Sequence, residues 1–143
     1  MKNNNRGKDN TLVPLFSTSV TCGYPSETDD DHVDMPIDFN ELILPHRSST
    51  YCLRASGDSL KDAGILDGDI IVVDKSLEPI NNNLVVAMVD GGFTAKRLRI
   101  ETKNGVKRIW LHPENEDYND IEITETMEFS LFGVISGVVR TLR

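Results

Sequence analysis

Two extended runs joined by a tight turn make up the stretch LVVAMVDGGFTAKRLRI, residues 84–100. The runs 84–89 and 93–100 are rich in β-branched and apolar residues, and Asp90-Gly91-Gly92 separates them. A short connection that contains glycine between two such runs is typical of a β-hairpin. We therefore expect two antiparallel strands here, and this hairpin sets the fold class for the rest of the chain.

Other segments on both sides of this hairpin have the same character. β-Branched or alternating apolar runs bounded by turn residues predict further strands at 51–55, 70–74, 106–111, 121–123 and 129–142. Only short helical turns are expected, at 41–44 before Pro45 and at 61–63. The pattern predicts a mainly β domain over residues 41–143, built on a bent antiparallel sheet.

Residues 1–40 differ from that domain in composition. A polar start is followed by a short apolar patch at 12–16 and then by an acidic stretch without Lys or Arg. The seven acids of that stretch are Glu27, Asp29, Asp30, Asp31, Asp34, Asp38 and Glu41. Such a stretch buries little and repels itself, so we expect a flexible, extended and solvated N-terminal arm. The alternative is a simple disordered tail.

The charge balance and cysteine content narrow the function classes. The 143 residues include 15 Lys and Arg against 23 Asp and Glu, a net charge of −8, which argues against direct, specific DNA binding. No apolar run approaches the roughly 18–20 residues that cross a bilayer, and no signal peptide is evident, so we expect a cytoplasmic protein. Two cysteines make neither a disulfide scaffold nor a zinc site, and we expect no cofactor.

One serine stands where a nucleophile is chemically reasonable. Ser59 lies in Ser56-Gly57-Asp58-Ser59-Leu60, directly after a predicted strand and before a helical turn. A serine at the start of such a turn has free backbone N–H groups beside it, which can stabilise an oxyanion. The alternative is an ordinary turn with a capping serine.

A nucleophilic serine needs a base, and a lysine is a better candidate than the histidines. His32 lies in the acidic arm, and His46 and His112 each adjoin a proline in a predicted loop. Strand alternation instead places Lys96 on the apolar face of 93–100, opposite Arg97 and Arg99. Burial lowers the pKa of a lysine, so a Ser–Lys dyad is possible. The alternative is a lysine that extends to solvent at a sheet edge.

Three separated motifs resemble the LexA/UmuD family of self-cleaving Ser/Lys peptidases from the bacterial SOS response. They are residues 55–59, 64–70 and 89–98, and the stretch 14–26 resembles a cleavage region of that family. The family's domain is a bent antiparallel sheet of the LexA/signal-peptidase type. Leu60 is a departure, because the family usually has Met at this position.

The resemblance implies a role for each of these residues. Ser59 would be the nucleophile, Lys96 the general base, and the backbone N–H groups of Asp58 and Ser59 the oxyanion donors. The scissile bond would be Cys22–Gly23. The implied partners are a RecA filament on single-stranded DNA, which stimulates self-cleavage, and a UmuC-like Y-family translesion polymerase, to which the trimmed chain is an accessory subunit.

Other functions are weighed against this one. A polymerase-binding module with a vestigial dyad is the main alternative, and a GDSL-type esterase lacks its Asp-x-x-His after the serine. A LexA-type repressor would need a helix-turn-helix of about 60–70 residues before the domain. Because residues 129–142 are apolar on both alternating faces, we also expect a homodimer.

Overall fold

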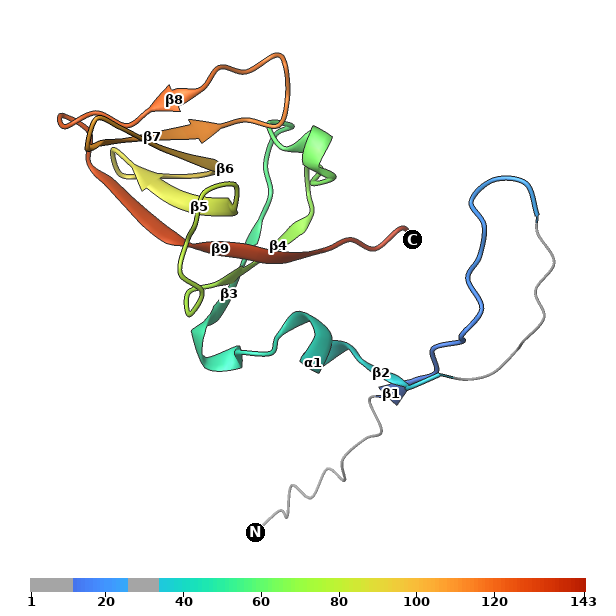
Figure 1. Cartoon of the computed structure of the whole chain (residues 1–143). Helices are drawn as coiled ribbons and strands as arrows, with labels where there is room; N and C mark the ends of the chain where they lie inside the picture. The colour runs from blue at the N-terminus through green and yellow to red at the C-terminus, as the bar shows by residue number, and fades with distance from the viewer. Residues whose placement is uncertain (1–11, 26–33) are drawn as a thin grey trace, which may run out of the picture. The chain divides into compact units, whose positions relative to one another are not determined.

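The computed structural model describes residues 12–25 and 34–143 (Figure 1). The chain divides into two units, Met1–Pro45 and His46–Arg143, each of which is described by itself.

The first unit contains a small antiparallel pairing that the sequence did not predict. Strand β1 (Leu12–Val13) pairs with β2 (Ile37–Asp38), and helix α1 (Phe39–Ile43) follows directly. The Asp38 side chain accepts the N–H of Asn40 at 2.9 Å and so caps α1. Strands of two residues carry no readable alternation, which is why sequence reasoning expected only an extended arm. Four of its seven acids, Glu27 and Asp29 to Asp31, lie outside the described residues.

The second unit is one antiparallel sheet of seven strands, as the mainly β prediction required. The strand order is β3-β4-β9-β5-β6-β7-β8. The bounds are β3 Thr50–Arg54, β4 Ile70–Asp74, β5 Leu84–Val89, β6 Gly92–Lys103, β7 Val106–His112, β8 Ile121–Glu122 and β9 Phe129–Val139. Two 3₁₀ turns, Arg47–Ser49 and Lys61–Ala63, precede and follow β3. The fold class is therefore confirmed.

Some strands end at other residues than predicted. Two of them are longer, because polar residues continue the hydrogen-bonded pairing with the neighbouring strand. β6 extends three residues beyond the predicted 93–100, because Asn104 and Gly105 both have positive φ and form a tight turn that pairs Lys103 with Val106. At the other end of the same pair of strands, His112 is the last residue of β7 and pairs with Arg97. The prediction that His112 lies in a loop was therefore wrong. β9 ends at Val139 and not at Leu142.

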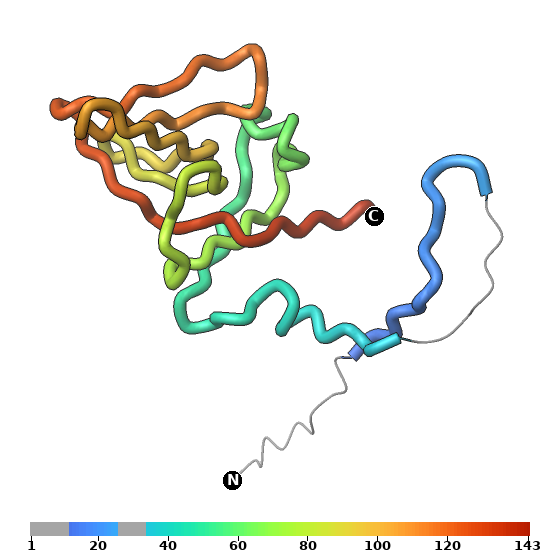
Figure 2. Tube along the Cα trace, viewed as in Figure 1, coloured from blue at the N-terminus to red at the C-terminus, as the bar shows by residue number. Residues whose placement is uncertain are grey.

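Strand β9 lies in the middle of the sheet and bends it. It pairs with β4 on one side and β5 on the other, and Figure 2 shows it running alongside both. The register shifts between Val72 and Val73 and between Val86 and Ala87, which leaves one extra β9 residue opposite each step. This central position explains why β9 is apolar on both faces, so that pattern no longer requires a dimer.

The two faces of the sheet carry separate apolar clusters. One contains Leu60 and Ile65 from the segment after β3, packed on Ile71, Val73 and Val86. The other consists of Val85, Ala87, Leu98 and Leu111. Because adjacent residues of β5 point to opposite faces, this strand contributes to both clusters. The first cluster anchors the segment that carries Ser59.

Candidate active site

Backbone geometry brings Ser59 into position just beyond the end of β3. The ladder with β4 is extended by Ala55, whose N–H donates to the Asp69 carbonyl at 2.7 Å. The chain then turns at Gly57, whose φ of +89° is in the left-handed region that favours glycine. The Gly57 N–H donates to the Asp67 carboxylate at 2.8 Å. The turn directs the chain back toward the sheet before the buried Leu60.

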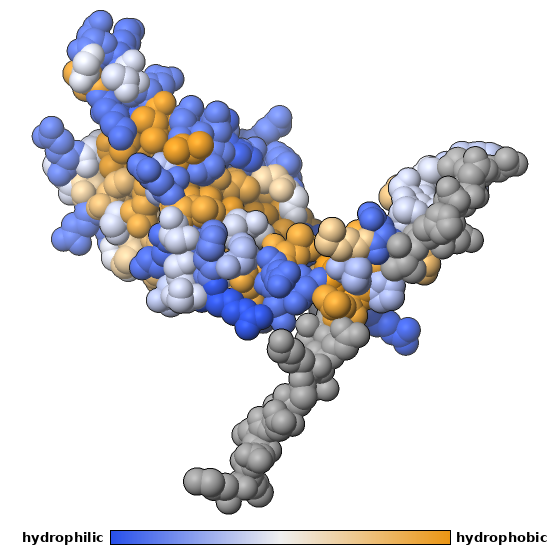
Figure 3. Space-filling model, turned by 60° about the horizontal axis from the view of Figure 1, so that its bottom comes forward, coloured by the Kyte–Doolittle hydropathy of each residue, from blue (hydrophilic) through white to orange (hydrophobic). Residues whose placement is uncertain are grey.

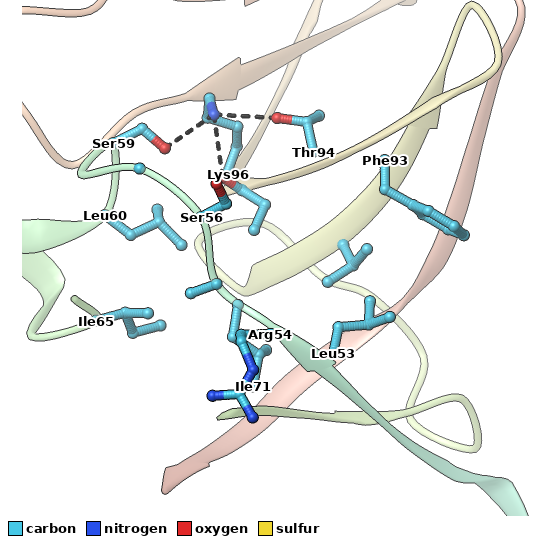
Figure 4. Close-up of a pocket in the computed structure, with 14 residues that line it drawn as sticks. Leu53, Arg54, Ser56, Ser59, Leu60, Ile65, Ile71, Phe93, Thr94 and Lys96 are labelled. Atoms are coloured by element: carbon cyan, nitrogen blue, oxygen red, sulfur yellow. Dashed lines mark hydrogen bonds between the residues drawn. The ribbon is translucent and has the colours of Figure 1, made fainter. Parts of the chain in front are cut away.

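Lys96 lies on β6, and its amine lies next to the Ser59 hydroxyl. The Nζ–Oγ distance is 3.0 Å (Figure 4). The same nitrogen is 3.0 Å from Thr94 Oγ1 and 3.2 Å from the Ala95 carbonyl oxygen. A charged ammonium would donate to all three oxygens, whereas a neutral amine donates two hydrogen bonds and keeps one lone pair. In the neutral form, with Thr94 and Ala95 as acceptors, the lone pair would face the Ser59 hydroxyl.

The surroundings of Lys96 favour the neutral amine. Its side chain is only 9% exposed, and no carboxylate of the described residues forms an ion pair with it. Burial therefore lowers the pKa of Lys96 below its usual value, since water no longer solvates the charged form. An amine with a lowered pKa is a stronger candidate for a base near neutral or mildly alkaline pH.

Backbone donors are available beside the hydroxyl. Within the part of the chain that the structure describes, neither the Asp58 N–H nor the Ser59 N–H donates to a protein acceptor. The Asp58 carbonyl, by contrast, accepts the Lys61 N–H at 3.1 Å. Free N–H groups beside a nucleophile can stabilise the negative charge that develops on an attacked carbonyl oxygen.

A pocket of about 330 Å³ opens next to the serine and the lysine. Its wall is mostly apolar and includes Val86. Figure 4 shows the other large apolar side chains around it: Leu53, Leu60, Ile65, Ile71 and Phe93. Phe93 is 57% exposed at the pocket. Such a lining suits an apolar side chain of a peptide, held beside the groups that can do chemistry.

The predicted cleavage segment belongs to the first unit. Cys22 is an exposed free thiol, and a side chain built at Gly23 would meet nothing within 4 Å. The Thr21 hydroxyl donates to the Tyr24 carbonyl at 3.1 Å across a bend. Val20 and Tyr24 are also exposed, so the backbone around Cys22–Gly23 is accessible.

The histidines have other partners. His46 Nδ1 lies 2.6 Å from the buried Asp74 carboxylate, and His112 Nδ1 lies 2.5 Å from Asp120. Neither histidine contacts Ser59, while His32 lies outside the described residues. Neither His46 nor His112 is therefore placed to act as the base for Ser59. The mainly antiparallel sheet likewise does not fit the α/β architecture of a GDSL esterase.

Sequence reasoning missed several residues around the site. Thr94 was not predicted as a partner of Lys96, although a spacing of two residues in a strand puts both side chains on one face. The loop after β7 was not considered at all. Its Glu114 N–H donates to the Ser59 carbonyl at 2.8 Å, a contact across 55 residues for which the sequence carries no pattern.

Comparison with known proteins shows relatives over most of the chain. Residues 14–136 match the Peptidase S24-like family. Protein ImpA of Escherichia coli is 31% identical over 137 residues, which cover 96% of this chain and 90% of that protein. Protein SamA of Salmonella typhimurium is 34% identical over 133 residues, covering 93% and 89%. The LexA repressor of Colwellia psychrerythraea is 39% identical over 101 residues, covering 70% of this chain and 46% of the repressor.

The chain therefore belongs to the Peptidase S24-like family, an SOS-related family of self-cleaving serine peptidases. The predicted resemblance to the LexA/UmuD family is confirmed. Among residues 12–25 and 34–143, we find no helix with the length and apolar character of a membrane span.

Proposed function

We propose that the protein cleaves its own chain between Cys22 and Gly23, with Ser59 as nucleophile and Lys96 as general base. The observation that carries this proposal is the 3.0 Å contact between Lys96 Nζ and Ser59 Oγ at a buried amine. A serine beside a lysine with a lowered pKa can be deprotonated without a histidine.

The proposed reaction gives each of these groups one role. Neutral Lys96 takes the Ser59 proton as Oγ attacks the carbonyl carbon of Cys22. The N–H groups of Asp58 and Ser59 stabilise the oxyanion. The Cys22–Gly23 bond then breaks, and Lys96 returns the proton to the leaving amine of Gly23. A water molecule, deprotonated by Lys96, hydrolyses the ester between Cys22 and Ser59, which frees a carboxylate and restores the hydroxyl.

Docking of the cleavage segment as an added strand is part of the proposal. β6 pairs with β5 over residues 92–97, but with β7 only from Arg97 onward. Among the described strands, residues 92–96 therefore have one unpaired edge next to Lys96. An extended peptide can bind such an edge by main-chain hydrogen bonds. Val20 and Cys22 would then point to the same side, and an apolar side chain would fill the pocket.

The biological setting is proposed from the family. A RecA filament on single-stranded DNA would favour the docked conformation of the arm, which shifts a population without adding catalytic groups. The trimmed chain would then be an accessory subunit of a UmuC-like Y-family polymerase. We also propose a homodimer, since apolar side chains such as Tyr51, Phe93 and Ile80 are exposed and the face in Figure 3 carries apolar residues among charged ones.

Intact-mass spectrometry tests the proposed function. The full chain is incubated at mildly alkaline pH, and separately with RecA assembled on single-stranded DNA. We expect two products, residues 1–22 and 23–143, from the wild type and none from Ser59→Ala. An uncut wild-type chain under both conditions would favour a polymerase-binding module with a vestigial dyad.

A further inference from the structure

The loop between β7 and β8 holds the segment that carries Ser59 through four hydrogen bonds. Two are backbone contacts: Glu114 N–H donates to the Ser59 carbonyl at 2.8 Å, and Asp62 N–H donates to the Glu114 carbonyl at 2.9 Å. The other two use side chains and both end on Asp58. Asn115 Nδ2 donates to the Asp58 carbonyl at 2.9 Å, and the Tyr118 hydroxyl donates to the Asp58 carboxylate at 2.7 Å.

Asn115 is built into this loop as a rigid donor. It is 4% exposed, and its Oδ1 accepts the Asp117 N–H at 2.9 Å. The Asn115 carbonyl also accepts the Tyr118 N–H at 3.2 Å. Because the amide oxygen is fixed by its own loop, the Nδ2 group has a defined direction, and this direction is toward Asp58.

The Asn115 hydrogen bond, together with the Lys61 N–H at 3.1 Å, fixes the Asp58 carbonyl and with it the orientation of the next N–H. A peptide group is planar and trans, so the Asp58 C=O and the Ser59 N–H lie in one rigid plane and point in opposite directions. A donor that fixes the carbonyl therefore also fixes the Ser59 N–H. This is one of the two N–H groups that the mechanism uses to stabilise the oxyanion.

We propose that Asn115 is a positioning residue that orients the Asp58–Ser59 peptide so that the Ser59 N–H faces the attacked carbonyl oxygen, and that Tyr118 supports it by holding the Asp58 side chain. This inference rests on the proposed self-cleavage. It assigns a role in oxyanion stabilisation to a loop more than 50 residues away in sequence, and neither residue touches the reacting atoms.

The Asp58 carboxylate also favours the form of Tyr118 that donates this hydrogen bond. It raises the pKa of the Tyr118 phenol above its usual value, because ionising the phenol would remove the donor and place two negative charges side by side.

The test is the pH profile of self-cleavage for Asn115→Asp, Asn115→Ala and the wild type. Asn115→Asp keeps the shape and the oxygen that accepts from Asp117, but it replaces the donor to Asp58 by an acceptor. Loss of one oxyanion donor costs about 10²–10³ in rate, so we expect a loss of at least about tenfold at the alkaline plateau. The midpoint of the Asn115→Ala profile should not move, because this variant adds no charge near Lys96 and leaves the contacts of the amine unchanged. Glu116→Gln, in the same loop with an exposed side chain, should cleave like the wild type.

If the Asn115 variants do not fold, variants of Tyr118 and Asp58 test the positioning role instead. Tyr118→Phe removes one hydroxyl from a side chain that is 46% exposed, and we expect a several-fold loss at the plateau. In an Asp58→Ala background the same change should have no further effect, since its partner is gone. A thermal melt of each variant shows whether it is folded at the assay temperature.

The outcomes separate the two proposals. If the wild type does not cleave, both the self-cleavage and the positioning role are wrong. If the wild type cleaves and all folded variants of Asn115 and Tyr118 reach the wild-type plateau, only the positioning role is wrong. A purely structural role predicts a rate loss no greater than the loss of folded protein.

Discussion

Lys96 Nζ lies 3.0 Å from Ser59 Oγ although 37 residues separate them in the sequence. The contact depends on two independent pieces of the fold. The hairpin of β5 and β6 carries the lysine, and the segment after β3, anchored by Leu60, carries the serine. Burying an amine that has no carboxylate partner is expected to reduce the stability of the domain, and removing the amine tests this.

Replacing Lys96 with methionine should leave the domain at least as stable as the wild type. Methionine keeps the length of the side chain and removes the cost of burying an amine, so we expect the free energy of unfolding to stay the same or rise by up to about 2 kcal/mol. Urea denaturation measures it. Lys107→Met, the same change at an exposed position, should alter it by less than about 0.5 kcal/mol. A loss of more than 2 kcal/mol at Lys96 would mean that the amine is structural.

Gly133 is the position of β9 at which no side chain fits. An added Cβ would lie 2.6 Å from Val73 Cγ1 and 3.3 Å from the Asp74 carbonyl oxygen. Gly133→Ala should therefore destabilise the domain by about 1–3 kcal/mol through overpacking. At Gly92 the nearest atom is the Val89 carbonyl oxygen at 3.7 Å, so Gly92→Ala is the matched control. Equal melting temperatures for the two variants would contradict this account of the centre of the sheet.

The bounds of a strand could be predicted where apolar residues fill it. They could not be predicted where pairing with a neighbouring strand sets the end. The bounds of β4 and β5 agree with the predicted 70–74 and 84–89, because their inward side chains are β-branched or apolar. The tail of β6 is polar and depends on its turn with β7. The serine and the lysine could be chosen from strand alternation and family resemblance. Asn115 could not, since a hydrogen-bond partner from a distant loop leaves no periodic signal, and for Thr94 the alternation gives only a shared face with Lys96.

Stability toward acid should depend on Asp69. The Arg140 guanidinium, then the Leu66 N–H, hold the pKa of Asp69 at about 2. A carboxyl with a lowered pKa in the folded state stabilises it fully above its unfolded value of about 3.9, and this contribution is lost as the pH falls toward 2. The stability difference between the wild type and Asp69→Asn should therefore shrink between about pH 4 and 2. Asp62→Asn changes an exposed carboxyl, and its stability should vary with pH as that of the wild type does. A stability difference between the wild type and Asp69→Asn that stays constant over this pH range would contradict the prediction.

Gly23 should matter for cleavage and not for folding. A Cβ built at Gly23 meets nothing within 4 Å, so Gly23→Val should leave the melting temperature unchanged. When the scissile bond reaches Ser59, a β-branched side chain next to the attacked carbonyl should slow cleavage at least about tenfold. Tyr24→Ala, one residue further on and 92% exposed, should remain within about threefold of the wild type. Cleavage of Gly23→Val at the wild-type rate would place the scissile bond elsewhere.

The most direct test of the Ser59–Lys96 dyad is the rate of self-cleavage against pH, followed by intact mass from about pH 7 to 10.5. If neutral Lys96 is the base, the rate of formation of residues 23–143 should rise with pH and become constant above the lowered pKa of Lys96, below the value of an exposed lysine. Ser59→Ala and Lys96→Ala should give no product at any pH. Cleavage between Cys22 and Gly23 by Lys96→Ala at the wild-type rate would contradict the assignment of the base, and cleavage by Ser59→Ala would contradict the peptidase itself.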